Sequence, residues 1–461
     1  MIFVMLWTDI LVWVLVAAVL FLGWRVSRSE QVKKQWHTVF KSSIAMASAI
    51  VLAFYLFFTL LDSVHLRLSL ESTKTSTKQV QYSEQVQYSE IVSLLDLILE
   101  HNIESTERTY SAPFALSEYT KSIVVDAKRV TQQVHIPLKY VSIDGDIVAE
   151  SIKAIVLGIG FSVLLILLHL FWRVGSGIKD TLVLIIQGKT QLPWRTAYLT
   201  FTVLITTFTW FYFLSFDYHV LGTDKVGGDV LYQSLKSIRT GVLIGILTTL
   251  IMLPVAIILG VSAGLFGGWV DDVIQYLYTT LSSIPGVLLI AAGVLSMQVM
   301  MSNNPTWFES TIERSDLRLL FLILILGITS WTGLCRLLRA ETLKISQIEY
   351  VTAAKAFGVS KLTIIRRHII PNLMHIILIS VVLDFSGLVL AEAVLSYVGV
   401  GVDPTMHSWG NMINQARLEM AREPMVWWSL FSAFIFMFVL VLAANLLSDR
   451  VQKVLDPRNK S

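Results

Sequence analysis

Nine apolar stretches of about 20 residues or more alternate with polar segments along the chain. They span approximately 3–24, 42–61, 152–172, 197–216, 240–264, 273–300, 317–338, 372–399 and 427–448. About 20 apolar residues in a helix cross the hydrocarbon core of a bilayer, so we expect nine membrane-spanning helices. Basic residues follow the first stretch rather than precede it, and it has no small-residue cleavage pattern. This arrangement predicts a retained helix instead of a signal peptide.

Composition agrees with a polytopic membrane protein. Hydrophobic residues make up 54% of the 461 residues and charged residues only 15%. The net charge of +3 is mild and gives no indication of nucleic-acid binding. Cys335 is the single cysteine, so the chain cannot form an internal disulfide.

The polar segments that are rich in Lys and Arg predict the orientation of the chain. These segments are 25–41, 173–195, 336–368 and 450–461, and the nine-helix pattern places all four on one side. Basic loops favour the cytoplasmic side, so we expect the N-terminus outside and the C-terminus in the cytoplasm. The turn 265–272 departs from the rule, because it has two aspartates and no basic residue.

Segment 62–151 is the one long extramembrane region between the apolar stretches. It contains the hexapeptide QVQYSE twice in tandem, at 79–84 and 85–90. Residues 91–100 have helical spacing, whereas 134–150 alternate and include an Asp-Gly turn signal. We therefore expect a small, mixed, mostly helical extracytoplasmic domain. A docking surface for an extracytoplasmic partner and a passive insertion are both compatible with this sequence.

A basic island at Glu341–Pro371 interrupts the apolar pattern. Tyr350, Ala353, Ala354 and Phe357 follow helical i, i+3, i+4, i+7 spacing, which places them on one face of a short helix. Gly358 is suited to end that helix.

A second short helix is expected after Ser360, followed by re-entry into the membrane at Pro371. Its predicted packed side carries Leu362, Ile365 and Ile369, while its outer side carries Lys361, Arg366 and Arg367. An interfacial loop with an amphipathic helix would give the same pattern.

The same island resembles the EAA loop of ABC importer permeases, whose signature is E-A-A-x3-G-x9-I-x-L-P. The matching stretch is TAAKAFG followed by HIIP, with Thr352, His368 and Ile370 in place of the signature Glu, Ile and Leu. In that family the loop docks on a cytoplasmic ATPase subunit. The resemblance implies ATPase-coupling roles for Tyr350, Thr352, Ala353, Ala354, Phe357, Gly358, Arg366, Arg367 and Pro371.

Residues 195–461 as a whole resemble the C-type permease subunit of dipeptide, oligopeptide and nickel importers. HVLGTDKVGGDVL at 219–231 is similar to that subunit's H-P-L-G-T-D-x-x-G-R-D-V-L motif, with Val220 for Pro and Gly228 for Arg. Segments 263–272, 331–341, 390–413 and 446–458 also look like recurring stretches of the family. The outer-loop residues that the resemblance marks are His219, Gly222, Thr223, Asp224, Asp229, Trp409 and Gly410.

The resemblance implies an all-α polytopic protein with a six-helix type I ABC importer permease core. About three extra N-terminal helices and the small extracytoplasmic domain would be additions to this core. The expected division is two helices in 1–61, the extracytoplasmic domain in 62–151, a third helix and linker in 152–194, and the core in 195–461 with its coupling loop at 341–371.

Other residues within the core have more than one interpretation. The glycines at 222, 227 and 228 favour a simple outer turn over direct ligand contact, and Pro285 is expected to kink its helix. Trp409, Trp427 and Trp428 are expected to be interfacial anchors. Asp384 and Glu392 are intramembrane carboxylates and hence candidates for a substrate cavity, although Glu392 is also compatible with a structural hydrogen bond.

The chain carries no recognisable catalytic or metal-binding motif. Gly188-Lys189-Thr190 resembles the end of a Walker A loop, but Val183 occupies the position of its first glycine. The family resemblance therefore implies that ATP and Mg bind to separate subunits. The expected partners are a second homologous permease, two ATPase subunits, an extracytoplasmic binding protein and membrane lipid, with no nucleic acid.

These observations predict a non-catalytic permease subunit of a bacterial inner-membrane importer for peptides or a similar small solute. The sequence does not distinguish a peptide from a nickel chelate, glutathione or an oligosaccharide. A membrane sensor that uses the 62–151 domain is an alternative, which explains the first 190 residues but not the permease motifs. A secondary transporter is a third option, although its usual internal repeats are not evident.

Overall fold

The computed structural model describes residues 2–28, 30–69, 88–125, 131–142, 146–174, 178–308 and 310–455. Within these ranges eight helices are long and apolar enough to cross a membrane. The first apolar stretch forms a helix whose apolar part, Trp7–Phe21, is shorter. The chain is thus a mostly helical, multi-pass bundle.

The N-terminal part contains eight helices and five short strands. Its helices are α1 (Trp7–Ser27), α2 (Glu30–Phe40), α3 (Ser43–Asp62), α4 (Leu94–Ile98), α5 (Glu100–Glu104), α6 (Ile147–Val174), α7 (Ile178–Ile186) and α8 (Trp194–Leu214). Its strands are β1 (Ile2–Val4), β2 (His65–Ser69), β3 (Tyr88–Ser93), β4 (Ser122–Val125) and β5 (Thr131–Val134). Strands β1, β2 and β3 form one antiparallel sheet, and β4 and β5 form a separate hairpin.

The C-terminal part has helices as its regular elements, joined by loops. Its α-helices are α9 (Val230–Phe266), α10 (Gly268–Ser283), α11 (Gly286–Asn303), α12 (Thr311–Ser346), α13 (Glu349–Ala356), α14 (Lys361–Ile364), α15 (Ile370–Val398), α16 (Trp409–Glu419) and α17 (Trp428–Leu455). A 3-10 turn covers Pro305–Trp307, and a π-helical turn covers Ile365–Ile369.

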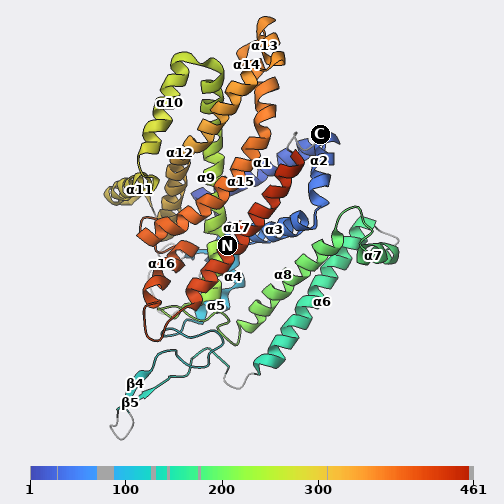
Figure 1. Cartoon of the computed structure of the whole chain (residues 1–461). Helices are drawn as coiled ribbons and strands as arrows, with labels where there is room; N and C mark the ends of the chain where they lie inside the picture. Colours follow the sequence, from blue (N-terminus) through green and yellow to red (C-terminus); the bar gives the residue numbers. More distant parts are fainter. Residues whose placement is uncertain are drawn as a thin grey trace, which may run out of the picture.

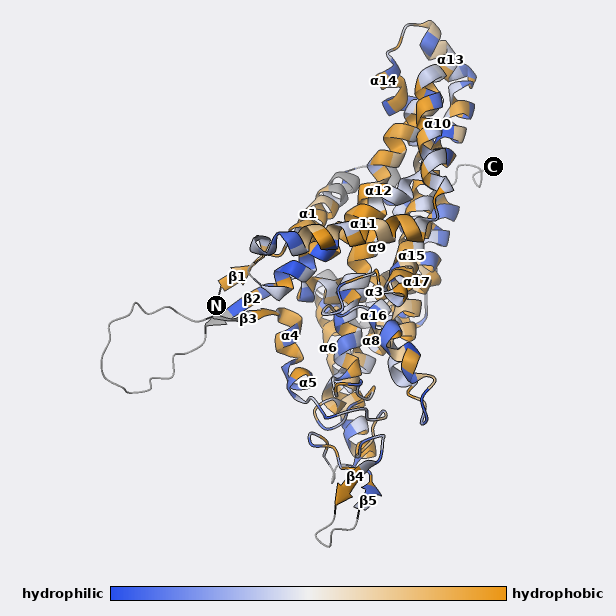
Figure 2. Ribbon diagram, turned by 90° about the vertical axis from the view of Figure 1, so that its left-hand side faces the viewer, coloured by the Kyte–Doolittle hydropathy of each residue, from blue (hydrophilic) through white to orange (hydrophobic). Residues whose placement is uncertain are grey.

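The bundle has two distinct ends. Helices α13 and α14 form one tip, and the β4–β5 hairpin projects from the opposite end (Figure 1). Hydrophobic residues dominate the helices between these ends, while hydrophilic residues are frequent at α13 and α14 (Figure 2). This banding is the distribution expected of a protein that crosses a bilayer.

Helices α9 and α12 form the central pair of the core. A Cβ atom at Gly260 of α9 would lie 2.8 Å from the carbonyl oxygen of Cys335 on α12. Only glycine allows this approach, and small residues at such contacts are typical of membrane helix pairs. Both helices exceed 35 residues, so they extend past the hydrocarbon layer toward the α13 tip.

Two of the nine predicted segments, 273–300 and 240–264, differ from the prediction in ways that affect the core. Segment 273–300 is two helices, α10 and α11, because the residue before Pro285 is extended, with φ −88° and ψ 131° at Ile284. The predicted segment 240–264 begins ten residues earlier, at Val230. Lys236 and Arg239, which we expected in an outer loop, therefore lie inside α9.

The described part of segment 62–151 is less helical than predicted. Residues 91–93 belong to strand β3, so the helix expected over 91–100 begins only at Leu94, which Ser93 caps. Strand β5 ends at Val134, and 135–142 are largely irregular instead of alternating as a strand. Both regions pack on the core rather than on a core of their own. The tandem hexapeptides fall almost entirely outside the described residues, as does the Asp-Gly turn at 144–145.

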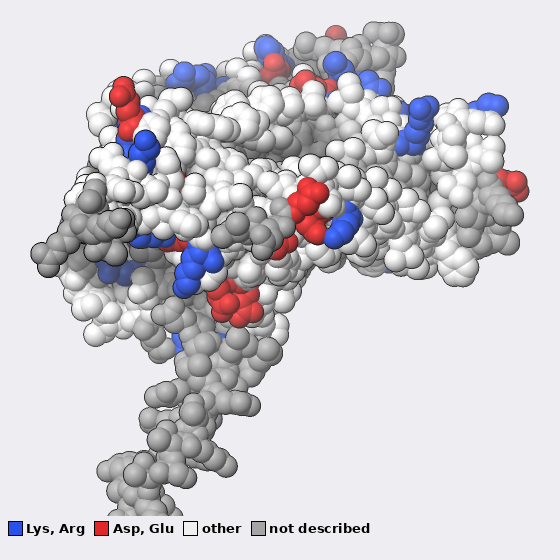
Figure 3. Space-filling model, turned by 90° about the horizontal axis from the view of Figure 1, so that it is seen from below, with Lys and Arg blue, Asp and Glu red and all other residues white. Residues whose placement is uncertain are grey.

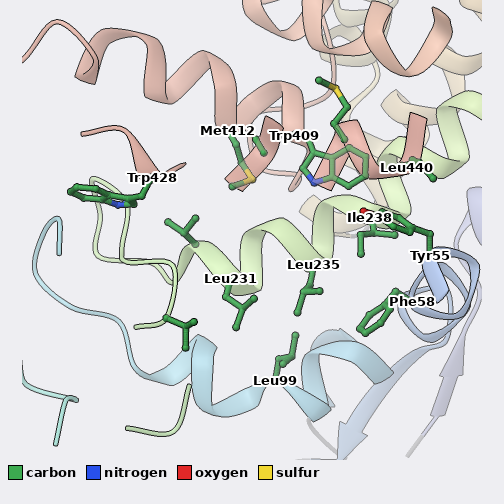
Figure 4. Close-up of a cluster of buried hydrophobic side chains, with 14 of the residues drawn as sticks. Tyr55, Phe58, Leu99, Leu231, Leu235, Ile238, Trp409, Met412, Trp428 and Leu440 are labelled. Atoms are coloured by element: carbon green, nitrogen blue, oxygen red, sulfur yellow. The ribbon is translucent and has the colours of Figure 1, made fainter. Parts of the chain in front are cut away.

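A large apolar cluster joins the N-terminal part to the core. Tyr55 and Phe58 of α3 and Leu99 after α4 meet Leu231 and Leu235 of α9 (Figure 4). Trp409 and Trp428 are only 1% exposed in this cluster. Their indole N–H groups donate to the carbonyls of Ser234 and Thr223, so these two residues are buried packing elements and not interfacial anchors. Trp427 is 44% exposed, as an anchor would be.

Candidate functional site

The predicted coupling segment forms the exposed tip of the core. Helix α12 continues to Ser346, and the short helix α13 follows almost at once. The α13 helix ends before Gly358, whose φ of +77° is a left-handed conformation that favours glycine. The next turn starts at Ser360, whose hydroxyl accepts a hydrogen bond from the Thr363 N–H.

The face predicted for docking is accessible. Phe357 is 88% exposed and Tyr350 is 44% exposed, while Ala353 is exposed and Ala354 is partly buried. Val351, on the opposite side of α13, is fully buried and anchors the helix to the core. The Phe357 side chain at the end of α13 is therefore accessible to a partner.

Tyr350 also links this tip to the start of α15. The Asn372 side chain donates to the Tyr350 hydroxyl at 3.0 Å, and the ring of His368 lies 5.8 Å from the Tyr350 ring. The exposed tip is therefore connected to a membrane-spanning helix by direct contacts.

The packed face of the second short helix differs from the prediction. Ile364 and Ile369 are buried, but Leu362 is 75% exposed. The π-helical turn at Ile365–Ile369 inserts an extra residue per turn and shifts the register of the face. Arg366, Arg367 and Lys361 are exposed as predicted, and Pro371 lies in the first turn of α15. Thr352 is exposed, with its hydroxyl bonded to the Glu349 carbonyl.

The outer-loop motif forms a structured cap on α9. Asp229 is the N-cap residue, and one of its oxygens accepts from the Tyr232 N–H at 2.9 Å. Its other oxygen lies 2.9 Å from Nδ1 of His219. Asp224 closes the loop by accepting from the N–H groups of Val226 and Gly228. The motif residues therefore have structural roles that explain their spacing.

The extracytoplasmic domain covers this loop. Thr223 and Ser111 exchange backbone and side-chain hydrogen bonds, and the Glu107 N–H donates to the Gly227 carbonyl at 3.0 Å. A Cβ atom at Gly227 would lie 1.8 Å from the Glu107 carbonyl oxygen, so only glycine fits. A Cβ atom at Gly222 would lie 2.5 Å from the Ser111 carbonyl oxygen. The loop that was expected to be a simple turn therefore packs against Glu107 and Ser111 and forms an interface within the chain.

The two intramembrane carboxylates have different surroundings. Glu392 is 2% exposed, accepts a hydrogen bond from Ser396 at 2.8 Å and interacts with the backbone of Gly410. This burial favours the structural role for Glu392 over a cavity role. Asp384 is partly buried, next to the exposed residue Leu383.

Comparisons of this chain with protein families and with curated proteins point to the same family. Residues 256–461 match the family described as binding-protein-dependent transport system inner membrane component. The glutathione transport system permease protein GsiD of Pectobacterium atrosepticum is 32% identical over 243 residues, covering 53% of this chain and 74% of that protein. This chain belongs to the family. It is a permease component of an ABC importer, and such subunits are non-catalytic.

Two more permease proteins support the assignment. The dipeptide transport system permease protein DppC of Bacillus subtilis is 30% identical over 52% of this chain and 69% of its own length. The oligopeptide transport system permease protein OppC of Mycobacterium tuberculosis is 32% identical over 53% and 77%. A solved structure of the MetNI methionine ABC transporter matches with 16% identity and a TM-score of 0.37, covering 49% of this chain and 95% of that one. These curated relatives match the C-terminal half of the permease, and we refer to its N-terminal half as the extension.

The permease also contains a buried ion-pair network that the sequence analysis missed. Arg239 of α9 is 5% exposed and donates to Asp9 Oδ1 and to the Thr8 hydroxyl, both at 2.7 Å. Asp316 of α12 lies 3.6 Å from the same guanidinium and accepts from Thr8. The second oxygen of Asp9 lies 2.7 Å from Nδ1 of His65.

Lys236, one helical turn earlier on α9, forms the second half of the network. Its ammonium lies 2.7 Å from Asp62 and also binds Asp96. The Tyr232 hydroxyl donates to Asp96 at 2.9 Å. Burial alone would raise the pKa of Asp96, but Lys236 and the hydrogen bonds from Ser93 and Tyr232 hold the pKa below its ordinary value. The carboxylate therefore stays charged at neutral pH.

The extension supplies most of the negative charge in this network. Asp9, Asp62 and Asp96 belong to the extension, whereas Lys236 and Arg239 belong to α9 of the core. A sequence signal was present, because Asp9 lies within the first apolar stretch and Asp62 directly follows the second. Intramembrane acids require a partner. The partner could not be identified without the fold.

Among the described residues, the permease has no group of His, Cys, Asp and Glu side chains that could hold a metal ion. Over the part of the outer end that Figure 3 shows, acidic and basic side chains lie in small mixed groups. That view therefore shows no extended field of one sign that would attract a solute of one charge.

Proposed function

We propose that this permease couples the ATP-driven closure of separate ATPase subunits to alternating access of a transmembrane pathway. The observation that carries the proposal is the exposed α13 tip, in which Phe357 projects from a helix that Val351 anchors to the core. A helix that is fixed to the core by Val351 and carries the exposed Phe357 side chain is suited to a contact that transmits force. ATP and Mg would bind to the ATPase subunits and not to this chain.

The expected assembly contains a second homologous permease, two ATPase subunits and an extracytoplasmic binding protein. One face of α15 supports a partner in the membrane, because Leu383, Leu390 and Val394 are 46–62% exposed along it. Asp384 lies beside this face and is our candidate for a pathway group. The basic α13 tip would face the cytoplasm, which places the N-terminus outside and the C-terminus inside.

Peptides or similar small solutes are the proposed substrates. The relatives described above are permeases for dipeptides, oligopeptides and glutathione, all of which contain peptide-type bonds. The sensor alternative has no support, because those relatives are permeases and the outer domain packs on the permease motif itself.

Substitution at the tip tests the coupling role. We expect Phe357→Ala to lower uptake of a labelled oligopeptide about tenfold or more, since loss of a contact hot spot costs about 2 kcal/mol. Gly358→Asp should abolish uptake, because a side chain is strained at φ +77° and adds a charge to the docking face. Membrane levels of both variants should match the wild type.

The matched control is Trp172→Ala at the end of α6, where the indole is 87% exposed but lies on the extension. This variant should transport normally. Normal uptake by both tip variants, at normal membrane levels, would refute the coupling assignment.

A further inference from the structure

An apolar groove of about 430 Å³ lies where the N-terminal extension meets the permease core. Helix α3 of the extension forms one wall, and α9, α15 and α17 of the core form the others. Trp36 of α2 also lines the groove. The groove therefore exists only because the extension packs against the core.

Two polar side chains of the groove lining have hydrogen-bond partners within the helices. The Tyr55 hydroxyl donates to the Phe436 carbonyl at 2.8 Å, and the Thr249 hydroxyl donates to the Gly245 carbonyl at 2.7 Å. The other polar lining residues are Ser448 and Gln452 in the last turns of α17, together with the Trp36 indole. Figure 1 shows α2 beside that end of α17. The groove is thus apolar along its length and polar at one end, like an amphiphile.

The length of the groove matches one leaflet of a bilayer. Its α17 wall runs from Leu440 to Gln452, which is about 18 Å at 1.5 Å per residue. Half of the hydrocarbon core of a bilayer is about 15 Å thick. A peptide would leave its backbone N–H and C=O groups unpaired along such a wall, which is costly, whereas an acyl chain has no such groups.

Exposed basic side chains outnumber acidic ones on the two segments at the polar end. The lysines are Lys33 and Lys34 on α2 and Lys453 at the end of α17, and the exposed acids are Glu30 and Asp449. Basic residues on an interfacial helix attract the phosphate of phospholipids, and tryptophan favours the same depth. We propose that the groove binds one membrane phospholipid, with an acyl chain along α17 and the phosphate at the α2 end.

Native mass spectrometry of the full chain in mild detergent, titrated with dioleoyl phosphatidylglycerol, tests this site. We expect one tightly retained lipid per wild-type chain. Leu56→Trp, at a groove position that is 41% exposed, should lower that affinity at least tenfold by filling the groove. The matched control is Leu168→Trp on α6, where the side chain is 62% exposed outside the groove, and it should retain the lipid.

A second groove variant controls for misfolding of the first. Ala444→Trp fills the groove from the α17 side and should behave like Leu56→Trp, provided that each variant elutes as a single species. Equal lipid retention by the wild type and both groove variants would overturn the proposal. Absence of any tightly retained lipid on the wild type would also overturn it.

The headgroup contact has its own test. Lys33→Gln with Lys34→Gln should reduce the preference for phosphatidylglycerol over phosphatidylcholine by up to about 25-fold, at about fivefold per lysine. A control pair in the extracytoplasmic domain, Lys121→Gln with Lys139→Gln, should leave the preference unchanged. An unchanged preference in the α2 pair would place the headgroup elsewhere and refute the assigned orientation.

Discussion

Arg239 illustrates how a single buried charge constrains this protein. Its guanidinium lies inside α9 with 5% exposure, and no residue of its own helix neutralises it. Asp9 and Asp316 approach it from α1 and α12, and Thr8 completes the hydrogen bonding. A buried ion pair gives little net stability, but removal of one partner is costly because it leaves an uncompensated charge.

We therefore expect Asp9→Asn to destabilise the permease by about 3–5 kcal/mol. The asparagine keeps the size of the side chain but leaves Arg239 and His65 without the Asp9 carboxylate. The midpoint of thermal unfolding in detergent measures the effect. Glu150→Gln removes an exposed pair with Lys153 and should leave the midpoint unchanged. Equal midpoints for Asp9→Asn and the wild type would contradict the role of the network.

The outer end should also be sensitive to mild acid through His407. Burial, reinforced by the charge of Lys236, lowers the pKa of His407 below its ordinary value of 6.5. The neutral His407 of the folded state contributes fully to stability above pH 6.5. This contribution is lost progressively as the pH falls below 6.5, because the unfolded state then binds more protons than the folded state. We expect His407→Gln to reduce the fall in unfolding midpoint between pH 7.5 and 5.5. A fall of the same size in the variant would show that other groups cause it.

At the scale of elements, the α9–α12 pair depends on small residues at its contact. Gly260 approaches the Cys335 carbonyl, and Gly264 lies one turn further along the same face of α9, against Thr342. Without a hydrophobic driving force between helices in lipid, such close packing supplies much of the association energy.

Gly260→Leu should accordingly separate α9 from α12 and destabilise the protein by about 1–3 kcal/mol or more. The unfolding midpoint and the yield of monodisperse protein measure this effect. Gly160→Leu on α6 is the matched control, because a Cβ there meets nothing within 4 Å. Similar losses in both variants would indicate a general effect of leucine and not a contact at Gly260.

The helices also show which local sequence signals were sufficient to predict their breaks and exposed faces. Pro285 predicted an interruption and the structure breaks the helix there, since proline disfavours helical geometry in the residue before it. The π-helical turn before α15 had no such signal, and Leu362, which was expected to be packed, is exposed. A one-residue register shift follows from how the two flanking segments pack, which local sequence does not encode.

At the scale of the whole molecule, the extension and the core are mutually dependent. Three carboxylates of the extension neutralise two cations of α9, and the extracytoplasmic domain covers the outer-loop motif. The extension is therefore a structural part of this permease, even though the curated relatives described above match only the C-terminal half.

Deletion of residues 1–190 should prevent accumulation of a folded core. Lys236 and Arg239 would then lack Asp9, Asp62 and Asp96, and the buried face of α9 would be exposed. Fluorescence-detected size-exclusion chromatography of the tagged core measures the outcome. Adding Lys236→Gln and Arg239→Gln to the truncated core should restore part of the folded fraction. A monodisperse truncated core without these changes would show that the extension is dispensable for folding.

Sequence alone was sufficient for the class of the protein, its family and the position of the short helix α13 that ends before Gly358. Each of these depends on local information: the length of apolar runs, the helical spacing of Tyr350 to Phe357, and motifs that are continuous in the chain. The partners of Lys236 and Arg239, the cover over Gly227 and the groove beside α17 emerged only in the tertiary structure. These features join residues that are distant in the sequence, and such pairings are decided by which charged and apolar faces the folded bundle brings together.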